Sequence, residues 1–377
     1  MKLTPHPMNK ILIAPRKYVQ GKNVMKDAGS LIRPIGRKVM VLWDAKVKSI
    51  VGETLLDSLK AAEVEVVDIL FNGECTKAEA ERVAAIASEN KVEVCIGVGG
   101  GKTLDTAKAA AAAAHTKTIT IPTIASNDSP TSSFTVWYDE QGNCTGFESW
   151  GVNPDLVLVD TQVIANGPVR AFVAGMGDAL STWVEATAVF KTRGPNLAGG
   201  TSTLAGMALC QLCRDILMEH GVEAKRAVEN HLVTPAVEKV VEANTLLSGL
   251  GFESSGVATA HMVANCLPSF PECHGKMHGE EVGFGIVTQL CLDDDLPVEQ
   301  MYQIVDFEIA IGLPVTFAEL GLAGVSRERL KVIGDICGGP GSLCENHPFK
   351  VTSDDIVTAM IAADALGTER KKLAGLS

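Results

Sequence analysis

The hydrophobic pattern of the first 165 residues or so alternates between short β-branched runs and longer helical periods. Five apolar runs predict strands: KVMVLW (38–43), EVEVVDILF (63–71), VEVCIGVGG (92–100), KTITIPT (117–123) and DLVLVD (155–160). The polar stretch TVWYDEQGNCTGFE predicts a hairpin with its turn at residues 141–143. Strands that alternate with helices in this way indicate right-handed crossovers and a parallel sheet.

The pattern changes after Asn166-Gly167-Pro168, and from about residue 178 to the end the periods are almost all helical. Eight such segments predict helices, at residues 178–190, 202–221, 236–251, 254–267, 278–292, 298–312, 327–337 and 353–367. The fold class predicted is therefore a Rossmann-like α/β parallel-sheet domain over residues 1–167 and an all-α domain over residues 168–377.

The composition excludes several classes of function. The chain has 377 residues, with 45 acidic and 33 basic ones and a formal net charge of −12, which disfavours nucleic acid or an anionic membrane as partner. No uninterrupted apolar run reaches the length of a membrane span, and the N-terminal run ILIA is too short for a signal peptide. Ten dispersed cysteines indicate reduced thiols in a cytoplasmic protein. Cys210 and Cys213 have CxxC spacing but lie inside a helical period, which disfavours a zinc or redox motif.

A glycine-rich turn, GVGGGKTLDTAK (97–108), lies between a predicted strand and a predicted helix. Backbone N–H groups and a helix N-terminus at such a turn bind phosphate. Ile96 breaks the P-loop template and Lys102 breaks the dinucleotide fingerprint, so the turn does not identify the nucleotide. A tight turn without a ligand is the alternative.

Two other stretches bear on ligand binding. The segment PTIASNDSPTSSF (122–134) follows a predicted strand and offers hydroxyls and the carboxylate of Asp128; the alternative is a solvated loop. Tyr18 and Lys22 have the spacing of a short-chain dehydrogenase pair, but they precede the first predicted strand and enclose Gly21, so we reject that motif.

The candidate metal ligands are an aspartate and three histidines. Asp178 follows Gly175-Met176-Gly177 and could be a helix N-cap, and His261 on an apolar segment could be a core residue. His274 and His278 are four residues apart, the spacing at which two imidazoles on a helix can share a metal ion. An Asp/His/His set with open positions is typical of a catalytic zinc or iron(II) site.

Six motifs together resemble the glycerol dehydrogenase branch of the iron-containing (group III metal-dependent) alcohol dehydrogenase family. They are GVGGGKTLDTAK, PTIASNDSPTS, NPDLVLVDT, GMGDALSTWVEA, VVEANTLLSGLGFESSGVATAH and HGEEVGFG, and their order and spacing match from about residue 10 to 366. The resemblance implies a dehydroquinate synthase-like architecture with the active site in a cleft between the two domains.

The resemblance also implies site residues. The metal ligands would be Asp178, His261 and His278, and these with Asp128 beside the substrate would form the catalytic set. His274 would line the substrate pocket without binding the metal. The residues expected to bind NAD are Asp44, Gly99, Gly100, Gly101, Lys102, Asp105, Thr123, Ser126, Ser132, Phe134 and Val136, with Asp44 on the adenosine ribose.

The activity implied is NAD-dependent oxidation of glycerol, or a related 1,2-diol, to dihydroxyacetone or a hydroxyketone. A divalent metal bound to the substrate oxygen lowers the pKa of the hydroxyl, and hydride leaves readily from the resulting alkoxide. Zn²⁺ is the metal of the resembled branch, although the ligand set would also accept iron(II) or manganese. The partners implied are a small polyol substrate and further copies of the chain in a large homo-oligomer, often an octamer.

Three departures from the resembled branch affect the expected substrate pocket. Ala264 stands where a second histidine is usual, Asn127 and Ser129 replace Thr and Ala, and the loop between the two C-terminal histidines, which contains Cys273 and Gly275, is one residue short. These changes keep a second reading open, in which a family member reduces a 2-oxoacid, hydroxyketone or aldehyde. A metal-free protein that only retained the fold is a third alternative, disfavoured by the presence of all three ligands.

Overall fold

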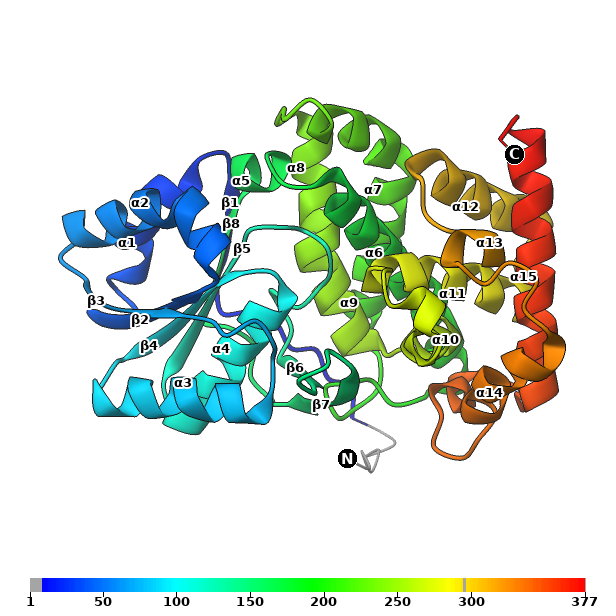
Figure 1. The fold of residues 1–377 in the computed structure, drawn as a ribbon, viewed down its shortest axis with the longest axis horizontal. Coiled ribbons are helices and arrows are strands. Elements are labelled where there is room, and N and C mark those ends of the chain that lie inside the picture. Colours follow the sequence, from blue (N-terminus) through cyan, green and yellow to red (C-terminus); the bar gives the residue numbers. More distant parts are fainter. Residues whose placement is uncertain (1–8, 294–295, 377) are drawn as a thin grey trace. The chain divides into compact units, whose positions relative to one another are not determined.

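The computed structural model describes residues 9–293 and 296–376, which divide into two compact units (Figure 1). Unit 1 contains Ile13–Phe172 and Arg226–Gly249, and unit 2 contains residues 9–12, Val173–Lys225 and residues 250–376. The sequence had suggested a single boundary after residue 167. The described chain instead passes from one unit to the other four times, because residues 9–12 and 226–249 pack away from their neighbours in sequence.

Unit 1 is built on a six-stranded sheet in the order β1-β8-β5-β4-β2-β3, in which every pairing is parallel. Its strands are β1 (Tyr18–Gly21), β2 (Lys38–Trp43), β3 (Glu65–Leu70), β4 (Val94–Gly99), β5 (Lys117–Pro122) and β8 (Leu156–Asp160). The predicted hairpin forms a separate antiparallel pair, β6 (Phe134–Tyr138) and β7 (Cys144–Ser149). The structure thus confirms the α/β parallel-sheet class.

Helices cover both faces of this sheet (Figure 1). Val39, Val41 and Trp43 of β2 pack in one core with α1 (Ala28–Ile32) and α2 (Ala45–Ala61). Met40 and Leu42 point the other way, into a core with α3 (Lys77–Glu89) and α4 (Gly101–Ala114). Successive side chains of a strand face opposite sides, so a strand buried on both faces is a continuous apolar run, as in the sequence KVMVLW.

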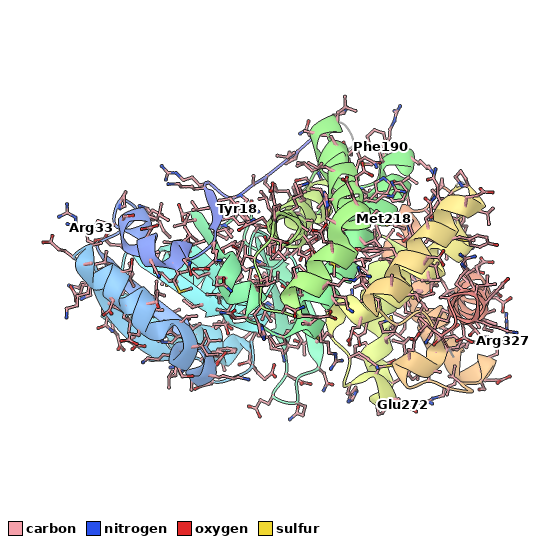
Figure 2. The ribbon with its side chains drawn as sticks, turned by 90° about the horizontal axis from the view of Figure 1, so that it is seen from above. Tyr18, Arg33, Phe190, Met218, Glu272 and Arg327 are labelled. Atoms are coloured by element: carbon pink, nitrogen blue, oxygen red, sulfur yellow. The ribbon has the colours of Figure 1, made fainter. Side chains whose placement is uncertain are left out.

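The first strand was missed by the sequence pattern. Tyr18–Gly21 is only YVQG, is half-buried and contains a polar residue, yet it pairs in register with β8 from Tyr18↔Val157 to Gly21↔Asp160. Side chains from 226–249 hold it in place: Tyr18, labelled in Figure 2, shares a hydrogen bond of 2.8 Å with Thr245, and Gln20 donates to the Glu238 carboxylate at 2.8 Å. These contacts place 226–249 in unit 1.

The remaining helices of unit 1 are short. They are η1 (Val24–Asp27), α5 (Thr161–Ala165), α8 (Pro235–Glu242) and the π-helical turn η2 (Ala243–Leu247).

Unit 2 is helical, as predicted. Two long helices, α6 (Val169–Thr192) and α7 (Leu204–Val228), each have one end in unit 1. The other helices are α9 (Ser248–Ser255), α10 (Thr259–Cys266), α11 (His278–Leu292), α12 (Val298–Ile311), α13 (Phe317–Leu320), α14 (Arg327–Cys337) and α15 (Ser353–Leu373). Three short helices complete the unit: η3 (Leu267–Ser269), η4 (Pro271–Cys273) and η5 (Leu343–Asn346). Within the described part of the chain, no helix is both long and apolar enough to cross a bilayer.

Two details of unit 2 differ from the sequence prediction. Asp178 does not cap a helix, because α6 begins at Val169 and runs through Gly175-Met176-Gly177. The segment 254–267 is not one helix: residues 256–258 separate α9 from α10, and Gly256 has a φ of +90°, which ends the first helix.

A buried glutamate on α12 has no compensating contact. The side chain of Glu308 is fully buried, and neither carboxyl oxygen has a hydrogen-bond partner among the described residues. Burial raises the pKa of Glu308 well above its ordinary value, because the interior disfavours the charged form.

We predict that Glu308→Gln stabilises the protein increasingly as pH rises. The folded state keeps a proton that the unfolded state loses near the ordinary glutamate pKa, so this group costs about 1.4 kcal/mol per pH unit above it. The urea concentration at the unfolding midpoint is measured for both proteins. The midpoint of Glu308→Gln minus that of wild type should increase between about pH 5 and about pH 7. A constant difference, or the same trend in the control Glu299→Gln on the exposed first turn of α12, would contradict the assignment.

Candidate functional site

One face of α6 carries three buried polar side chains. Asp178, Ser181 and Glu185 are spaced i, i+3 and i+7, so they lie along one side of the helix. Asp178 is 2% exposed, and Ser181 and Glu185 are fully buried. Buried carboxylates need charged or hydrogen-bonding partners, and the histidine of α10 provides them.

His261 lies on the first turn of α10 and contacts both carboxylates. Its Nδ1 is 2.5 Å from Glu185 Oε2, and its Nε2 is 3.5 Å from Asp178 Oδ1. The other Glu185 oxygen accepts hydrogen bonds of 2.8 Å from the backbone N–H groups of Ala258 and His261. Glu185 therefore fixes the ring, assigns the proton to Nδ1 and directs Nε2 toward Asp178.

His278 is the first residue of α11, as the sequence predicted, and completes the group. Its Nε2 is 3.6 Å from the same Asp178 oxygen, and its ring centre is 5.4 Å from that of His261. One ligand atom from each of Asp178, His261 and His278 lies within 4.8 Å of the others. A carboxylate and two imidazoles at this separation fit a divalent metal ion.

His274 is not part of this group. It lies before the start of α11, and its Nε2 is 2.9 Å from the backbone oxygen of Pro268. The two histidines therefore do not share a helix face, and the spacing argument for a His274–His278 metal pair was wrong. The helix begins only at His278, and residues 274–277 connect it to η4.

Glycines allow the three ligand-bearing helices to approach closely. A Cβ atom on Gly279 of α11 would lie 1.8 Å from the oxygen of Ala174 on α6, and one on Gly177 would lie 2.3 Å from the oxygen of Gly279. On α10, the oxygen of Ala260 would lie 2.2 Å from a Cβ on Gly285 of α11. The backbones are thus in direct contact next to each ligand, an approach that no larger residue permits.

The electrostatics of the group favour a bound cation. Burial lowers the pKa of His261, but the negative charges of Glu185 and Asp178 outweigh it and raise the pKa well above the ordinary value. For His278, burial lowers the pKa, Asp178 opposes it, and His261 lowers it further. Two carboxylates around one imidazole stabilise positive charge, carried either by a proton or by a metal ion.

The predicted cofactor residues of unit 1 lie at the carboxyl edge of its sheet. Asp44, Gly99 and Thr123 follow or end the adjacent strands β2, β4 and β5. Strand β3 lies on one side of β2, and the next strand in the chain, β4, lies on the other side. The strand order therefore reverses between β2 and β4, which makes their carboxyl ends the switch point of the sheet. Open α/β sheets bind ligands at that place.

The glycine turn leads directly into α4. Gly100 is the N-cap of the helix, and a Cβ on Gly101 would lie 2.7 Å from the side chain of Asn127. The Lys102 amine is paired with the Glu74 carboxylate at 2.7 Å and lies 4.5 Å from the centre of the Tyr138 ring. Asp44 caps α2 by accepting a 2.8 Å hydrogen bond from the Val47 N–H.

Asp105 and its neighbours form a buried network under the 122–134 loop. The Asp105 carboxylate accepts from Ser129 Oγ at 2.5 Å and from the Val136 N–H at 2.9 Å, and its other contact is Lys108 at 2.9 Å. Lys108 also donates to the backbone oxygens of Ser129 and Ser132. Asp105 is 4% exposed, and both of its carboxylate oxygens bind these groups. Its position therefore indicates that it holds the 122–134 loop in place.

The other predicted residues of unit 1 also fall in or beside this loop. Ser126 and Phe134 are buried, Thr123 donates its N–H to the oxygen of Gly99 at 3.0 Å, and an Asp128 carboxylate oxygen is 3.4 Å from Ser248 Oγ. Their assignment to a cofactor or substrate stays a prediction.

Sequence reasoning missed two polar residues. Glu185 was present in the quoted motif GMGDALSTWVEA, and its i+7 spacing from Asp178 was the available signal. Asn244, in the π-helical turn, is fully buried and donates to the oxygens of Ala125 and Phe172 at 3.0 and 3.1 Å. It holds the start of the loop that contains Ser126 and Asp128, and no local pattern indicated this contact.

Comparison with known proteins decides the family. Residues 15–161 match the model of the iron-containing alcohol dehydrogenases. Over 362 residues the chain is 40% identical to a glycerol dehydrogenase of Citrobacter freundii, covering 96% of this chain and 99% of that protein. The chain belongs to the iron-containing alcohol dehydrogenase family. Membership makes it an oxidoreductase and implies a divalent metal ion and a nicotinamide cofactor.

Two further proteins are similar to the chain over nearly its whole length. A protein of Halobacterium salinarum named glycolaldehyde reductase is 40% identical, over 96% of this chain and 98% of its own. The crystal structure of glycerol dehydrogenase from Schizosaccharomyces pombe superimposes with a TM-score of 0.94 at 34% identity, covering 98% of this chain and 94% of that one. Identity alone thus does not separate the two named substrates.

We predict that His278→Ala loses tightly bound divalent metal and that His274→Ala retains it. The first change removes one of three candidate ligand atoms, whereas the second removes a contact with the Pro268 oxygen, outside the group. Elemental analysis after dialysis against a weak chelator measures the metal content of each purified variant. Equal loss from both variants would restore the His274–His278 pair.

We also predict that Glu185→Gln weakens metal binding about 10- to 100-fold, the usual effect of removing a carboxylate that orients a ligating histidine. The amide keeps the size of the side chain but removes the charge next to His261 Nδ1. Competition with a chromophoric chelator gives the affinity. Glu223→Gln on the exposed face of α7 removes the same charge far from the group and should bind like wild type.

Proposed function

We propose that the protein oxidises glycerol, or a related 1,2-diol, to the hydroxyketone with NAD and a divalent metal ion. The observation that carries the proposal is the convergence of Asp178, His261 and His278 in a chain so similar to a glycerol dehydrogenase. None of the three contacts is accounted for by helix capping or by packing of the apolar core. The same residues are those that the family resemblance had implied.

The roles of the residues follow from their contacts. Asp178, His261 and His278 would hold the metal ion, which when bound supplies Lewis-acid stabilisation of negative charge on a substrate oxygen. With the metal ion bound, Glu185 would hold the proton of His261 on Nδ1 and leave Nε2, on the side of Asp178, as the ligand atom. Among the metals that this donor set accepts, we propose zinc.

We propose the carboxyl edge of the unit 1 sheet as the NAD site. The N-terminus of α4 at Gly100 and Gly101 offers backbone N–H groups for a pyrophosphate, assisted by the helix dipole. Asp44 at the end of β2 would accept a hydrogen bond from the adenosine ribose, and its charge would repel a 2′-phosphate, which favours NAD over NADP. Asn244 and Asp105 would position the loop that lines this edge.

A second candidate function is reduction of a small hydroxyaldehyde. It is favoured by the equal identity to the protein named glycolaldehyde reductase and by Ala264 in place of a histidine. The two candidates share their chemistry, because reducing a hydroxyaldehyde gives a 1,2-diol. They differ in preferred substrate and direction.

One assay separates the candidates. Purified protein should reduce NAD in the presence of glycerol, 1,2-propanediol or ethylene glycol, should lose this activity with a chelator, and should regain it when zinc is restored. Ethanol and 1-propanol are matched alcohols that lack the second hydroxyl and should be poor substrates. The opposite direction is measured with NADH and dihydroxyacetone or glycolaldehyde. No turnover of any diol or hydroxycarbonyl after zinc is restored would refute the proposal.

Asp178→Asn provides the control for the metal. The amide is a weaker ligand without charge, so metal content and turnover should fall together, by about 100-fold or more in rate. Metal retention at wild-type level with normal turnover in this variant would exclude Asp178 as a ligand.

A further inference from the structure

Four of the ten cysteines lie in one buried apolar cluster of unit 2, and three of them, Cys266, Cys337 and Cys344, interact with one another. Cys266 ends α10, Cys337 ends α14 and Cys344 lies in η5, and all three belong to one buried apolar cluster. Cys337 lies close enough to Cys266 and Cys344 to shift the pKa of each of them. Free thiols in mutual contact form a disulfide when an oxidant reaches them, and the surroundings of each thiol decide which one reacts.

Cys344 has three polar neighbours, Thr259, Ser342 and His347. Thr259 Oγ1 donates a hydrogen bond to Cys344 Sγ at 3.3 Å, and the same hydroxyl is 2.8 Å from His347 Nε2. His347 Nδ1 lies 3.0 Å from Asp293 Oδ1. Carboxylate, imidazole, hydroxyl and thiol thus lie in sequence, and the Thr259 hydroxyl is the group that donates to the sulfur.

These contacts stabilise a thiolate at Cys344. The hydrogen bond from the Cys337 thiol, together with those from Thr259 and Ser342, lowers the pKa of Cys344 below its ordinary value despite burial. The hydrogen bonds with Cys266 and Cys344, together with burial, raise the pKa of Cys337, which keeps its proton. A thiolate next to a protonated thiol is the arrangement of an attacking and a resolving cysteine.

A pocket gives an oxidant access to this pair. Its volume is about 420 Å³, and Cys337 and Cys344 both line it, with Gly338–Pro340, Phe349 and Lys350. Cys266 is not among its lining residues. The two lining cysteines are joined by the short segment Gly338-Gly339-Pro340-Gly341-Ser342-Leu343, in which Gly341 has a φ of +78°.

We propose that Cys344 is a peroxide-reactive thiolate and Cys337 its resolving partner. The Cys344 sulfur attacks one oxygen of hydrogen peroxide, the O–O bond breaks, and a sulfenic acid forms with release of hydroxide. The Cys337 sulfur then attacks the Cys344 sulfur, its proton and the sulfenic oxygen leave in a second water, and a disulfide results. Two thiols lose two electrons to peroxide, and two water molecules form. Neither step uses the dehydrogenase activity.

The chain offers a direct test, because Cys337 and Cys344 are the only cysteines of the tryptic peptide 332–350, whereas Cys266 and Cys273 lie in peptide 240–276. Reduced wild-type protein is exposed to limiting hydrogen peroxide in its native state, denatured, alkylated with iodoacetamide and digested. We expect peptide 332–350 to lose both alkyl groups and two hydrogen atoms, while peptide 240–276 stays fully alkylated. A sample without peroxide shows whether oxidation arose during purification.

Two outcomes would overturn the proposal. In the first, both thiols of peptide 332–350 remain alkylated at a peroxide dose that already oxidises the exposed Cys144. In the second, peptides 332–350 and 240–276 become cross-linked, which would pair Cys337 or Cys344 with Cys266 or Cys273 instead of with each other. Both outcomes are read from the wild-type protein, so neither depends on whether a cysteine variant folds.

Variants separate the roles of the two thiols. Cys337→Ser should accumulate a sulfenic acid at Cys344 that dimedone traps, and Cys344→Ser should leave Cys337 fully alkylated. Cys144→Ser is the matched control and should form the disulfide like wild type. Dimedone labelling of Cys337 rather than Cys344 would reverse the assignment.

Discussion

The candidate metal group depends on direct contact between helix backbones. Gly177, Gly279 and Gly285 leave no room for a Cβ atom where α6, α10 and α11 meet. Any side chain at these positions would separate the helices, and imidazoles of fixed length would no longer reach a carboxylate buried on α6. The glycines therefore explain why one aspartate and two histidines from distant parts of the sequence come within hydrogen-bonding range of one point. Glu185 then removes the remaining freedom of one ring.

The parts of the fold that the sequence predicted are those whose local pattern and tertiary environment agree. Strand β2 is apolar at every position but one, because both its faces are covered. The predicted start of a helix at His278 agrees with the first residue of α11. Strand β1 could not be predicted, because YVQG becomes a strand only through pairing with β8 and contacts with Thr245 and Glu238. Long-range contacts of this kind leave no periodic signal in a short segment.

The same reasoning accounts for the errors at the site. The glycines of GMGDA suggested a helix start, yet they lie within α6. Gly177 is needed there because the backbone of α11 contacts α6 at that position. The four-residue spacing of His274 and His278 suggested a shared helix face, yet the helix begins too late to include both. Family resemblance distinguished the two histidines, because it carries information about spatial neighbours that spacing alone does not contain.

The connectivity of the units has a consequence for synthesis. Unit 1 consists of Ile13–Phe172 and Arg226–Gly249, and the interval between them belongs to unit 2. Strand β1 is made early, but its partner side chains on α8 and the π-helical turn are made more than two hundred residues later. Domains usually fold as units during translation, the N-terminal one first. This α/β unit therefore cannot be completed until residue 249 has left the ribosomal exit tunnel. Until then β1 lacks its contacts with Glu238 and Thr245, although α6 and most of α7 of unit 2 have already been synthesised.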